Sequence, residues 1–428
     1  MWLVYELLYL LGFLLYLPSA IWRRRLPHRG WTMRLGRYPD AVAASLQGRP
    51  SVWVHAVSVG EALAARPLLA PLAERARQPL VMSTITPGGF DVASRQMEGR
   101  GPVVYFPLDL GACVSRALDA LKPRLLLLME SELWPNAIRL AASRGIPIAV
   151  VNGRLSPRAF ARYQWVKPWV RTMLGRVTLF LMQSQADADR LLALGVAGDK
   201  VRVAGNLKWD ASLGARPAAS AAQELMERLS VRSADIVVVA GSTHRGEETA
   251  VLDAFQALRA SHAEARLILA PRHLERLAEV EALIAHRGLP AARISKISGG
   301  TWQVGLVDVF GQLPLYYGLA TVVFIGGSLI PHGGQNPLEA AGLGKPVVFG
   351  PSMHNFEAIT HQLLAHHAAR QAENAQDLGR LLEELVSNRS EADAMGRRAQ
   401  ALIEQFQGAT QRTLDALAPF LTHPSSTT

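Results

Sequence analysis

Acidic side chains that could act as a general base follow two of the apolar runs in the first half of the chain. Glu61 lies shortly after Val52–Val57, near the start of a predicted helix, and Glu130 and Glu132 directly follow Leu125–Met129. A carboxylate held within hydrogen-bond reach of a hydroxyl can remove its proton, so Glu61 is a candidate base. Acids are also common in the first turn of a helix, and the residues alone leave that interpretation open.

A lysine near the middle of the chain could supply the opposite charge. Lys208 follows the apolar run Val201–Val203 and lies beside a stretch where the pattern of strands and helices breaks. A fixed cation there could stabilise negative charge on a leaving phosphate. Glu130 could position an acceptor or balance a cation, because carboxylates near a core are costly without partners. A lysine in a linker can equally be solvated.

Two glycine pairs and a candidate helix start follow the predicted strand Val322–Ile325. Asn336 is a good N-cap, and Pro337 suits the first position of a helix over 338–343. Free N–H groups at such a helix start can bind an anion. Glu339, in the first turn, is a reasonable acceptor for paired ribose hydroxyls. An ordinary glycine-rich turn remains the alternative, because short motifs recur by chance.

Further polar groups end two other predicted strands. The segment Ser242-Thr243-His244-Arg245 follows Ile236–Ala240, and Pro271-Arg272-His273 follows Leu267–Ala270. Hydroxyls and backbone amides at a strand end suit a phosphate or a carboxylate, and Arg272 can make two parallel bonds to an anion. No aspartate-rich motif suggests a bound metal.

The elements that must position these residues read as short apolar strands alternating with helical segments. This rhythm predicts parallel sheets with helices on both faces. It breaks near 208–222 and then restarts, so we expect a linker there and two doubly wound domains. Ligands of such sheets bind at the carboxyl ends of the strands, and two facing domains would create a cleft. Besides the runs already named, the predicted strands are Leu80–Ser83, Val103–Phe106, Ile148–Val151, Leu179–Gln183, Val304–Val307 and Val347–Phe349.

Length and charge limit the classes of function. The chain has 428 residues, 49% of them hydrophobic, and a formal net charge of +10. This balance favours anionic partners such as nucleic acid, anionic lipid or a phosphorylated substrate, although an arginine-rich surface alone would also produce it. The single cysteine, Cys113, excludes an internal disulfide framework.

The N-terminus is nearly as long and apolar as a membrane-crossing helix. Residues 1–22 contain one charged residue, Glu6, and Arg23-Arg24-Arg25 follow. Because the positive charge comes after the apolar stretch, this is not a typical cleaved signal peptide, and the rest of the chain is expected in the cytoplasm. Glu6 and the nearby tyrosines make a deep span unfavourable. We expect a tilted or interfacial anchor, with a buried amphipathic helix as the alternative.

A second stretch, over 154–171, interleaves basic and aromatic residues. It could bind nucleic acid, dock a phosphorylated lipid at a membrane, or form a solvated helix face. Together with an N-terminal anchor, the lipid interpretation is preferred over nucleic acid. The residues are Arg154, Arg158, Arg162, Lys167 and Arg171, with Phe160, Tyr163, Trp165 and Trp169.

Blocks of sequence in the same order along nearly the whole chain resemble the 3-deoxy-D-manno-octulosonic acid (Kdo) transferases of lipopolysaccharide synthesis, which are glycosyltransferases of the GT-B type. Seven blocks carry the resemblance: WVHAVSVGE (53–61), ESELWPN (130–136), NGRLSPRAFARYQ (152–164), GNLKWD (205–210), GSTHRGEE (241–248), PRH (271–273) and GGSLIPHGGQNPLEAA (326–341). Together they are far more specific than any one of them.

The resemblance implies a role for each candidate residue. It implies that Glu61 is the general base and that Glu130 works with Lys208, which stabilises the transition state. It assigns a pocket for cytidine monophosphate (CMP) to Pro271, Arg272, Phe310, Gly311, Gln312, Asn336, Pro337, Leu338 and Glu339. One departure is Gln312, where family members often have glutamate, so that a charge at the nucleotide site is lost.

The resemblance also implies a fold and an activity. We expect an anchor over 1–25, an acceptor-binding Rossmann-like domain over 26–210, a CMP-Kdo-binding one over 222–405, and a C-terminal helix and tail over 406–428. The expected activity is inverting, metal-independent transfer of Kdo from CMP-Kdo to a lipid A precursor (lipid IVA). Transfer would take place at the cytoplasmic face of a bacterial inner membrane, with an anionic membrane surface as partner and without nucleic acid or cofactor.

Two alternatives to this activity remain. The first is another GT-B enzyme, either a UDP-sugar transferase or a sugar-nucleotide epimerase, which a comparison of CMP with UDP would distinguish. The second is a non-catalytic membrane adaptor, in which the acids and the lysine at the strand ends would have no purpose.

Overall fold

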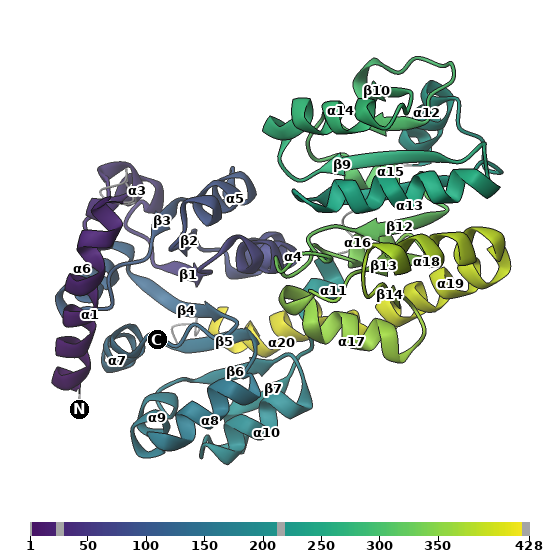
Figure 1. Ribbon diagram of the computed structural model, residues 1–428. Helices are drawn as coiled ribbons and strands as arrows, with labels where there is room; N and C mark the ends of the chain where they lie inside the picture. Colours follow the sequence, from purple (N-terminus) through teal and green to yellow (C-terminus); the bar gives the residue numbers. More distant parts are fainter. Residues whose placement is uncertain (1, 23–29, 212–218, 422–428) are drawn as a thin grey trace. The chain divides into compact units, whose positions relative to one another are not determined.

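The computed structural model describes residues 2–22, 30–211 and 219–421. The chain forms two compact units. Unit 1 consists of residues 1–211 and 407–428, and unit 2 of residues 212–406. Each unit contains a seven-stranded sheet with helices on both faces (Figure 1). Arg23-Arg24-Arg25, most of the predicted linker and the C-terminal tail fall outside the described residues.

The sheet of unit 1 is parallel throughout, in the order β3-β2-β1-β4-β5-β6-β7. Neighbouring residues of β1 point to opposite faces, so Trp53 enters one hydrophobic core and Val54 the other. Burial on both faces explains why the inner strands of this sheet are mostly apolar, whereas the edge strand β7 is largely exposed and contains Arg202. The strands are β1 (Ser51–His55), β2 (Leu80–Thr84), β3 (Val103–Tyr105), β4 (Pro123–Met129), β5 (Ile148–Gly153), β6 (Leu179–Met182) and β7 (Val201–Val203).

The helices of unit 1 include one from the far end of the chain. Leu414, Leu417 and Leu421 of α20 are buried in the same core as Leu68 and Leu72 of α4. The helices are α1 (Trp2–Trp22), α2 (Trp31–Arg34), α3 (Asp40–Leu46), α4 (Val59–Ala76), α5 (Pro87–Met97), α6 (Gly111–Leu121), α7 (Pro135–Ser143), α8 (Pro157–Trp165), α9 (Lys167–Leu174), α10 (Gln185–Ala193), α11 (Leu207–Ala211) and α20 (Ala409–Leu421).

Unit 2 repeats this arrangement with the strand order β10-β11-β9-β8-β12-β13-β14, again with parallel pairs. The strands are β8 (Val237–Thr243), β9 (Arg266–Pro271), β10 (Ala291–Arg293), β11 (Val304–Leu306), β12 (Val322–Ile325), β13 (Val347–Phe349) and β14 (Arg370–Gln371). The helices are α12 (Ala219–Leu229), α13 (Glu247–Ser261), α14 (Leu277–His286), α15 (Leu313–Leu319), α16 (Leu338–Ala341), α17 (Glu357–Ala365), α18 (Ala375–Ser387) and α19 (Arg389–Phe406).

The N-terminal helix α1 is attached to unit 1 by its polar side chains. The Tyr5 hydroxyl donates a hydrogen bond to the buried Asp109 carboxylate at 2.8 Å. Glu6 accepts hydrogen bonds from the Gly111 N–H at 2.7 Å and from the Asn136 side chain at 3.1 Å. These residues therefore have partners within the protein. Among the described residues, none of the helices combines the length and the apolar composition that crossing a bilayer requires.

Candidate active site

Side chains from three strands meet at the carboxyl edge of the sheet of unit 1. Glu61 follows β1, Glu130 follows β4, and Lys208 follows β7 on α11. The Lys208 ammonium lies 3.3 Å from a carboxylate oxygen of Glu130, and both side chains are largely buried. The fold thus brings together the three residues that the sequence singled out for chemistry in this unit.

Glu61 has the properties of a carboxylate that can exchange a proton near neutral pH. Its side chain is 9% exposed, and it accepts hydrogen bonds from the Val57 N–H at 2.8 Å and the Ser58 hydroxyl at 3.3 Å. Burial raises the pKa of Glu61 to about 8, with a further contribution from the negative charges of Glu132 and Glu130, and the two hydrogen bonds oppose this rise. Burial therefore outweighs the stabilisation that a helix start gives an acid.

Glu132 is a second carboxylate with a raised pKa. Burial and the nearby charge of Glu130 raise its pKa to about 7. It lines a cavity of about 310 Å³ with mostly aromatic and apolar walls. The other lining residues are Tyr5, Ser131, Leu133, Trp134, Pro135, Tyr163, Trp169 and Met173.

Neutral amide side chains fix the segment that carries Lys208. Asn152, at the end of β5, accepts a hydrogen bond from the Leu207 N–H at 2.9 Å. Gln183 donates to the Asn152 carbonyl, and Asn206 donates to the Gln183 side chain at 3.1 Å. The Asn206 oxygen accepts from the Lys208 N–H at 3.0 Å. We did not predict this ladder of amides. The only signal is that Asn152 and Asn206 lie within the blocks NGR and GNLKWD.

The candidate nucleotide residues of unit 2 share one edge of its sheet. Gly311 and Gln312 lie beyond β11, Pro271 and Arg272 at the end of β9, and Asn336 beyond β12. These strands are adjacent through β8, in the order β11-β9-β8-β12, and their carboxyl ends lie at the same edge because the pairs are parallel. The structure therefore places these loops side by side, although they are far apart in sequence.

A buried carboxylate that we did not predict organises two of these loops. Glu247, which is 0% exposed, accepts hydrogen bonds from the N–H groups of Gly327 at 2.6 Å and His244 at 2.9 Å with one oxygen. Its other oxygen accepts from Ser328 at 2.9 Å and Leu329 at 3.0 Å. The sequence signal is the Glu-Glu pair after Gly246, which resembles ordinary acids in a first helical turn.

The glycine-rich stretch differs from the prediction in two respects. The helix α16 begins at Leu338 and ends at Ala341, so it is shorter than the expected 338–343. A single turn has only a small dipole. The four amides bound to Glu247 belong to His244, Gly327, Ser328 and Leu329, so anion binding at the start of α16 stays a prediction. The N-cap of this turn is Pro337 and not the predicted Asn336, although the Asn336 side-chain oxygen accepts a hydrogen bond from the Leu338 N–H at 3.1 Å.

Glycine is required at the start of this loop by close approach and backbone angle. A side-chain carbon on Gly326 would lie 2.4 Å from the Ser242 carbonyl oxygen, and Gly327 has a φ of +69°. A larger residue would therefore clash with the backbone at position 326 and would be strained at position 327.

The other residues that were predicted to bind the nucleotide include two that form hydrogen bonds within their own loops. The side-chain oxygen of Gln312 accepts a hydrogen bond from the Tyr316 hydroxyl at 3.1 Å. A glutamine can therefore hold this turn without a charge. Phe310 is 65% exposed, and the Asn336 amide donates to Glu339 at 3.3 Å.

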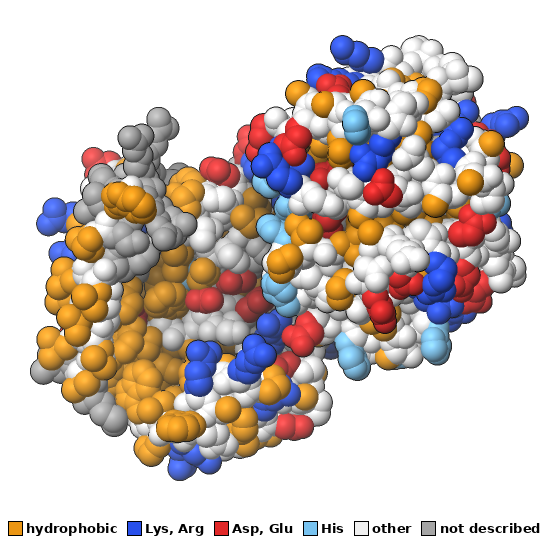
Figure 2. All heavy atoms as spheres, viewed as in Figure 1, with side chains coloured by type: hydrophobic (Ala, Val, Ile, Leu, Met, Phe, Trp, Pro, Cys, Tyr) orange, Lys and Arg blue, Asp and Glu red, His pale blue; other side chains and the backbone are white. Residues whose placement is uncertain are grey.

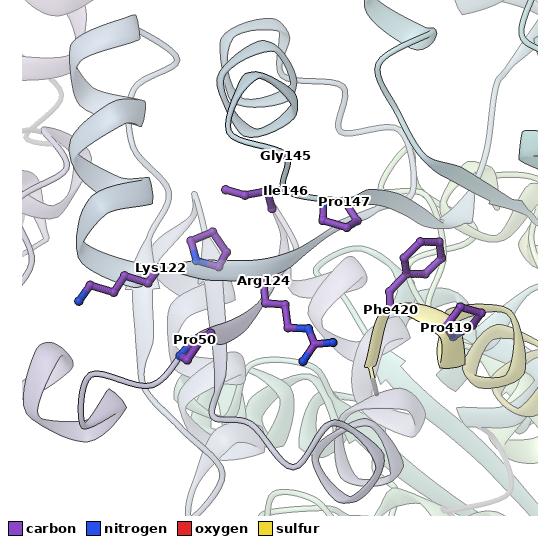
Figure 3. Close-up of a pocket in the computed structure, with 9 residues that line it drawn as sticks. Pro50, Lys122, Arg124, Gly145, Ile146, Pro147, Pro419 and Phe420 are labelled. Carbon is purple, nitrogen blue, oxygen red and sulfur yellow. The ribbon is translucent and has the colours of Figure 1, made fainter. Parts of the chain in front are cut away.

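A second cavity, of about 530 Å³, lies at the opposite edge of the sheet of unit 1 (Figure 3). Its walls are formed by residues at the starts of β4 and β5 and by Phe420 of α20. Its position at the amino ends of the strands separates it from Glu61. We therefore give it no role in the chemistry, because ligands of such sheets bind at the carboxyl ends. Within the described ranges, no group of histidine, cysteine or acidic side chains is arranged to hold a metal ion.

Comparison with known proteins places these observations in a family. Residues 29–211 match the family described as 3-deoxy-D-manno-octulosonic-acid transferase (kdotransferase). The chain is 32% identical over 417 residues to a 3-deoxy-D-manno-octulosonic acid transferase of Haemophilus influenzae, covering 95% of this chain and 94% of the relative. It is 33% identical to the transferase of the same description from Bordetella pertussis, over 94% of this chain and 95% of the relative.

Solved structures support the fold. A UDP-N-acetylglucosamine 2-epimerase has a TM-score of 0.58 at 14% identity, covering 89% of this chain and 99% of that structure. A similar protein from Listeria monocytogenes has a TM-score of 0.55 at 15% identity, covering 86% of this chain and 96% of that structure. At these identities the likeness shows a two-domain GT-B-like architecture and nothing about substrate.

Proposed function

The chain belongs to the 3-deoxy-D-manno-octulosonic-acid (Kdo) transferase family, and from this premise we propose that it transfers Kdo from CMP-Kdo to a hydroxyl of a lipid A precursor. The observation that carries the proposal is the group formed by Glu61, Glu130 and Lys208 at the carboxyl edge of unit 1. It combines a base of suitable pKa with a fixed cation, which transfer to a hydroxyl requires.

In the proposed reaction, Glu61 takes the proton of the acceptor hydroxyl. The hydroxyl oxygen forms a bond to the anomeric carbon of Kdo while the bond from that carbon to the phosphate oxygen of CMP breaks. CMP leaves with the electron pair, and Lys208 stabilises the negative charge that develops. Glu130 holds the ammonium at 3.3 Å. The family resemblance implies inversion at the anomeric carbon and metal-independent transfer.

The cavity beside Glu132 is a reasonable place for part of a lipid acceptor. Its walls are largely aromatic and apolar, with one carboxylate, as amphipathic ligands require. The CMP group of the donor is assigned to Pro271, Arg272, Phe310–Gln312 and Asn336–Glu339, which lie at one edge of unit 2.

The direct test is incubation of the full-length protein with CMP-Kdo and a tetra-acylated lipid A precursor, followed by mass spectrometry of the lipid. We expect lipid that carries added Kdo. A comparison of thermal stabilisation by CMP and by UDP separates this activity from a UDP-sugar enzyme. Stabilisation by UDP but not by CMP, with unmodified lipid, would overturn the proposal.

Replacement of Lys208 tests the role of the cation. For Lys208→Gln we expect kcat to fall by about 100-fold or more, since stabilising groups of this kind typically contribute that much. Lys122→Gln is a matched control, because this exposed lysine precedes β4 at the other edge of the same sheet. Steady-state assays of both variants check the prediction, and equal rates would remove Lys208 from the mechanism.

We also propose that α1 rests on a membrane surface. Its exposed side chains are mostly large and apolar, including Leu8 at 63%, Leu11 at 54% and Leu15 at 73% exposure, and Figure 2 shows hydrophobic side chains gathered over this helix. In the basic-aromatic stretch, Trp165 is 89% exposed while Trp169 packs against the core. An apolar helix face beside basic groups is typical of interfacial binding.

A charged triple variant tests this attachment. Leu8→Glu/Leu11→Glu/Leu15→Glu should sediment less with anionic vesicles than the unmodified protein, because it loses apolar area and gains negative charge. Leu63, an exposed apolar residue of α4, provides the control Leu63→Glu. Unchanged sedimentation of the triple variant would exclude α1 as the attachment site.

A further inference from the structure

Three histidines meet at the carboxyl edge of unit 2. The ring centroids of His244 and His332 lie 4.0 Å apart, and the ring of His273 lies 5.5 Å from that of His244. They come from the loops after β8, β12 and β9, which are adjacent strands. Several histidine side chains, pale blue in Figure 2, lie along one margin of this unit. The topology itself therefore assembles the cluster.

The charged groups with the largest effect on His244 are of one sign. They are Arg272 and Arg276, together with the rings of His332 and His273 when protonated. Arg276 is already paired with Glu248 at 2.8 Å and with Glu279 at 3.0 Å.

Arg272 and His273 have fewer ion pairs with buried or partly buried acids than Arg276 has. Among the described residues, no hydrogen bond or ion pair engages the Arg272 guanidinium. His273 lies 3.3 Å from Glu275, whose side chain is 77% exposed. The cluster thus contains a cation that lacks a counter-charge among the described residues.

The buried acid Glu247 does not neutralise this cluster. Glu247 lies beside the His244 backbone, but its two oxygens accept four backbone N–H groups. The same bonds occupy the amides of Gly327, Ser328 and Leu329, which would otherwise be available to a phosphate. For an anion that binds at these loops, side-chain cations are therefore the available partners, because these amides are already hydrogen-bonded.

We propose that His244, His332 and Arg272 form an anion subsite, in which an anionic group of the donor binds with uptake of a proton by His244. The inference rests on the proposed function, and it adds to the CMP pocket two histidines that the family resemblance did not assign. CMP-Kdo offers two groups of suitable chemistry, the phosphate and the sugar carboxylate. Arg272 supplies the permanent charge.

Protonation of His244 depends on the ligand. Burial, followed by the charges of His332, His273, Arg272 and Arg276, lowers the pKa of His244 to about 4 without an anion. The Gln335 amide nitrogen lies 3.1 Å from His244 Nε2, an arrangement in which the amide can donate to a neutral ring. A bound anion favours the protonated form of His244 and raises its pKa. Binding then takes up a proton, and affinity falls as pH rises through the pKa of the complex.

Calorimetry of the full-length protein tests the subsite. Titrations with CMP and with free Kdo, each in two buffers of different ionisation enthalpy at pH 6.5, give the number of protons taken up on binding. We expect uptake with the ligand that carries the responsible anion. His244→Asn should abolish most of this uptake, and His332→Asn, at an exposed position, should weaken binding by about tenfold, the usual value of one charge-assisted hydrogen bond. His366→Asn, at the exposed C-cap of α17, is the matched control.

The outcomes separate the subsite from the function. Uptake with CMP identifies the phosphate, and uptake with Kdo alone identifies the carboxylate; both support the proposal. Binding without uptake of protons, or uptake that His244→Asn leaves unchanged, overturns the subsite while the proposed function stands. If neither ligand binds the unmodified protein, the proposed donor and the subsite both fail.

Discussion

Glu61→Gln should lose transfer almost completely while it still binds CMP. A positioned general base contributes about 100- to 10,000-fold to rate, so kcat should fall by that factor. Glutamine can still accept from the Val57 N–H and the Ser58 hydroxyl, so the start of α4 should stay in place. Rates from a radiolabelled Kdo assay and CMP affinity from calorimetry check the two parts.

The control is Glu74→Gln, at an exposed acid of the same helix, which should behave like the unmodified protein. Turnover retained by Glu61→Gln would remove Glu61 from the role of base. Loss of CMP binding in that variant would indicate a structural defect instead.

The pH profile gives an independent measure of the same group. Because Glu61 must be ionised to act as a base and its pKa is about 8, kcat/KM should rise with pH and level off above that value. Glu132, with a pKa of about 7, titrates with it, so the apparent values belong to the cluster. Glu132→Gln removes a negative charge that raises the pKa of Glu61, and the rise should then move to lower pH.

Glu247→Ala should destabilise unit 2 more than any other single change proposed above. It leaves three buried N–H groups and one partly buried N–H group without an acceptor, and each unsatisfied buried group costs about 1–3 kcal/mol. We expect the unfolding free energy to fall by about 3 kcal/mol or more, and CMP binding to weaken as the loops lose their positions. Glu247→Gln should be intermediate, because its amide group offers one oxygen and a misplaced donor.

Hydrogen exchange measured by mass spectrometry distinguishes local release from global unfolding. The segment 326–330 should exchange faster in Glu247→Gln, while β5 of unit 1 keeps its protection. The control Glu279→Gln removes an exposed acid bound to Arg245 and Arg276, and it should leave this segment unchanged. Equal protection in both variants would mean that the carboxylate does not hold the loop.

Much of the architecture was predictable because each central strand is an apolar run buried on both faces. The strand β12, predicted over Val322–Ile325, has those bounds in the structure. The strands β10 and β14 were missed. They lie at the two edges of the sheet of unit 2, are two or three residues long, and contain no apolar run. Such edge strands form because they pair with a neighbouring strand, and this pairing cannot be read from a single sequence.

The candidate site was predictable where a residue type had an evident chemistry, and not where the role depended on tertiary partners. We could predict that Glu61, Glu130 and Lys208 act together because each follows a predicted strand and because of the family resemblance. Glu247 was overlooked because an acid in a first helical turn is ordinary, and only the fold brings four amides to it. Glu6 was interpreted as an obstacle to membrane insertion, whereas its partners lie more than a hundred residues away on Gly111 and Asn136.

The position of α20 has a consequence for biosynthesis. Unit 2 is a continuous segment of the chain, whereas unit 1 is completed by α20, which is synthesised after unit 2. Domains fold as units when they emerge from the ribosome, so unit 2 can reach its native state first. Unit 1 is synthesised earlier, but part of its hydrophobic core stays exposed until Leu414, Leu417 and Leu421 have been added. A premature stop codon after residue 406 would therefore harm the part of the protein that was synthesised first.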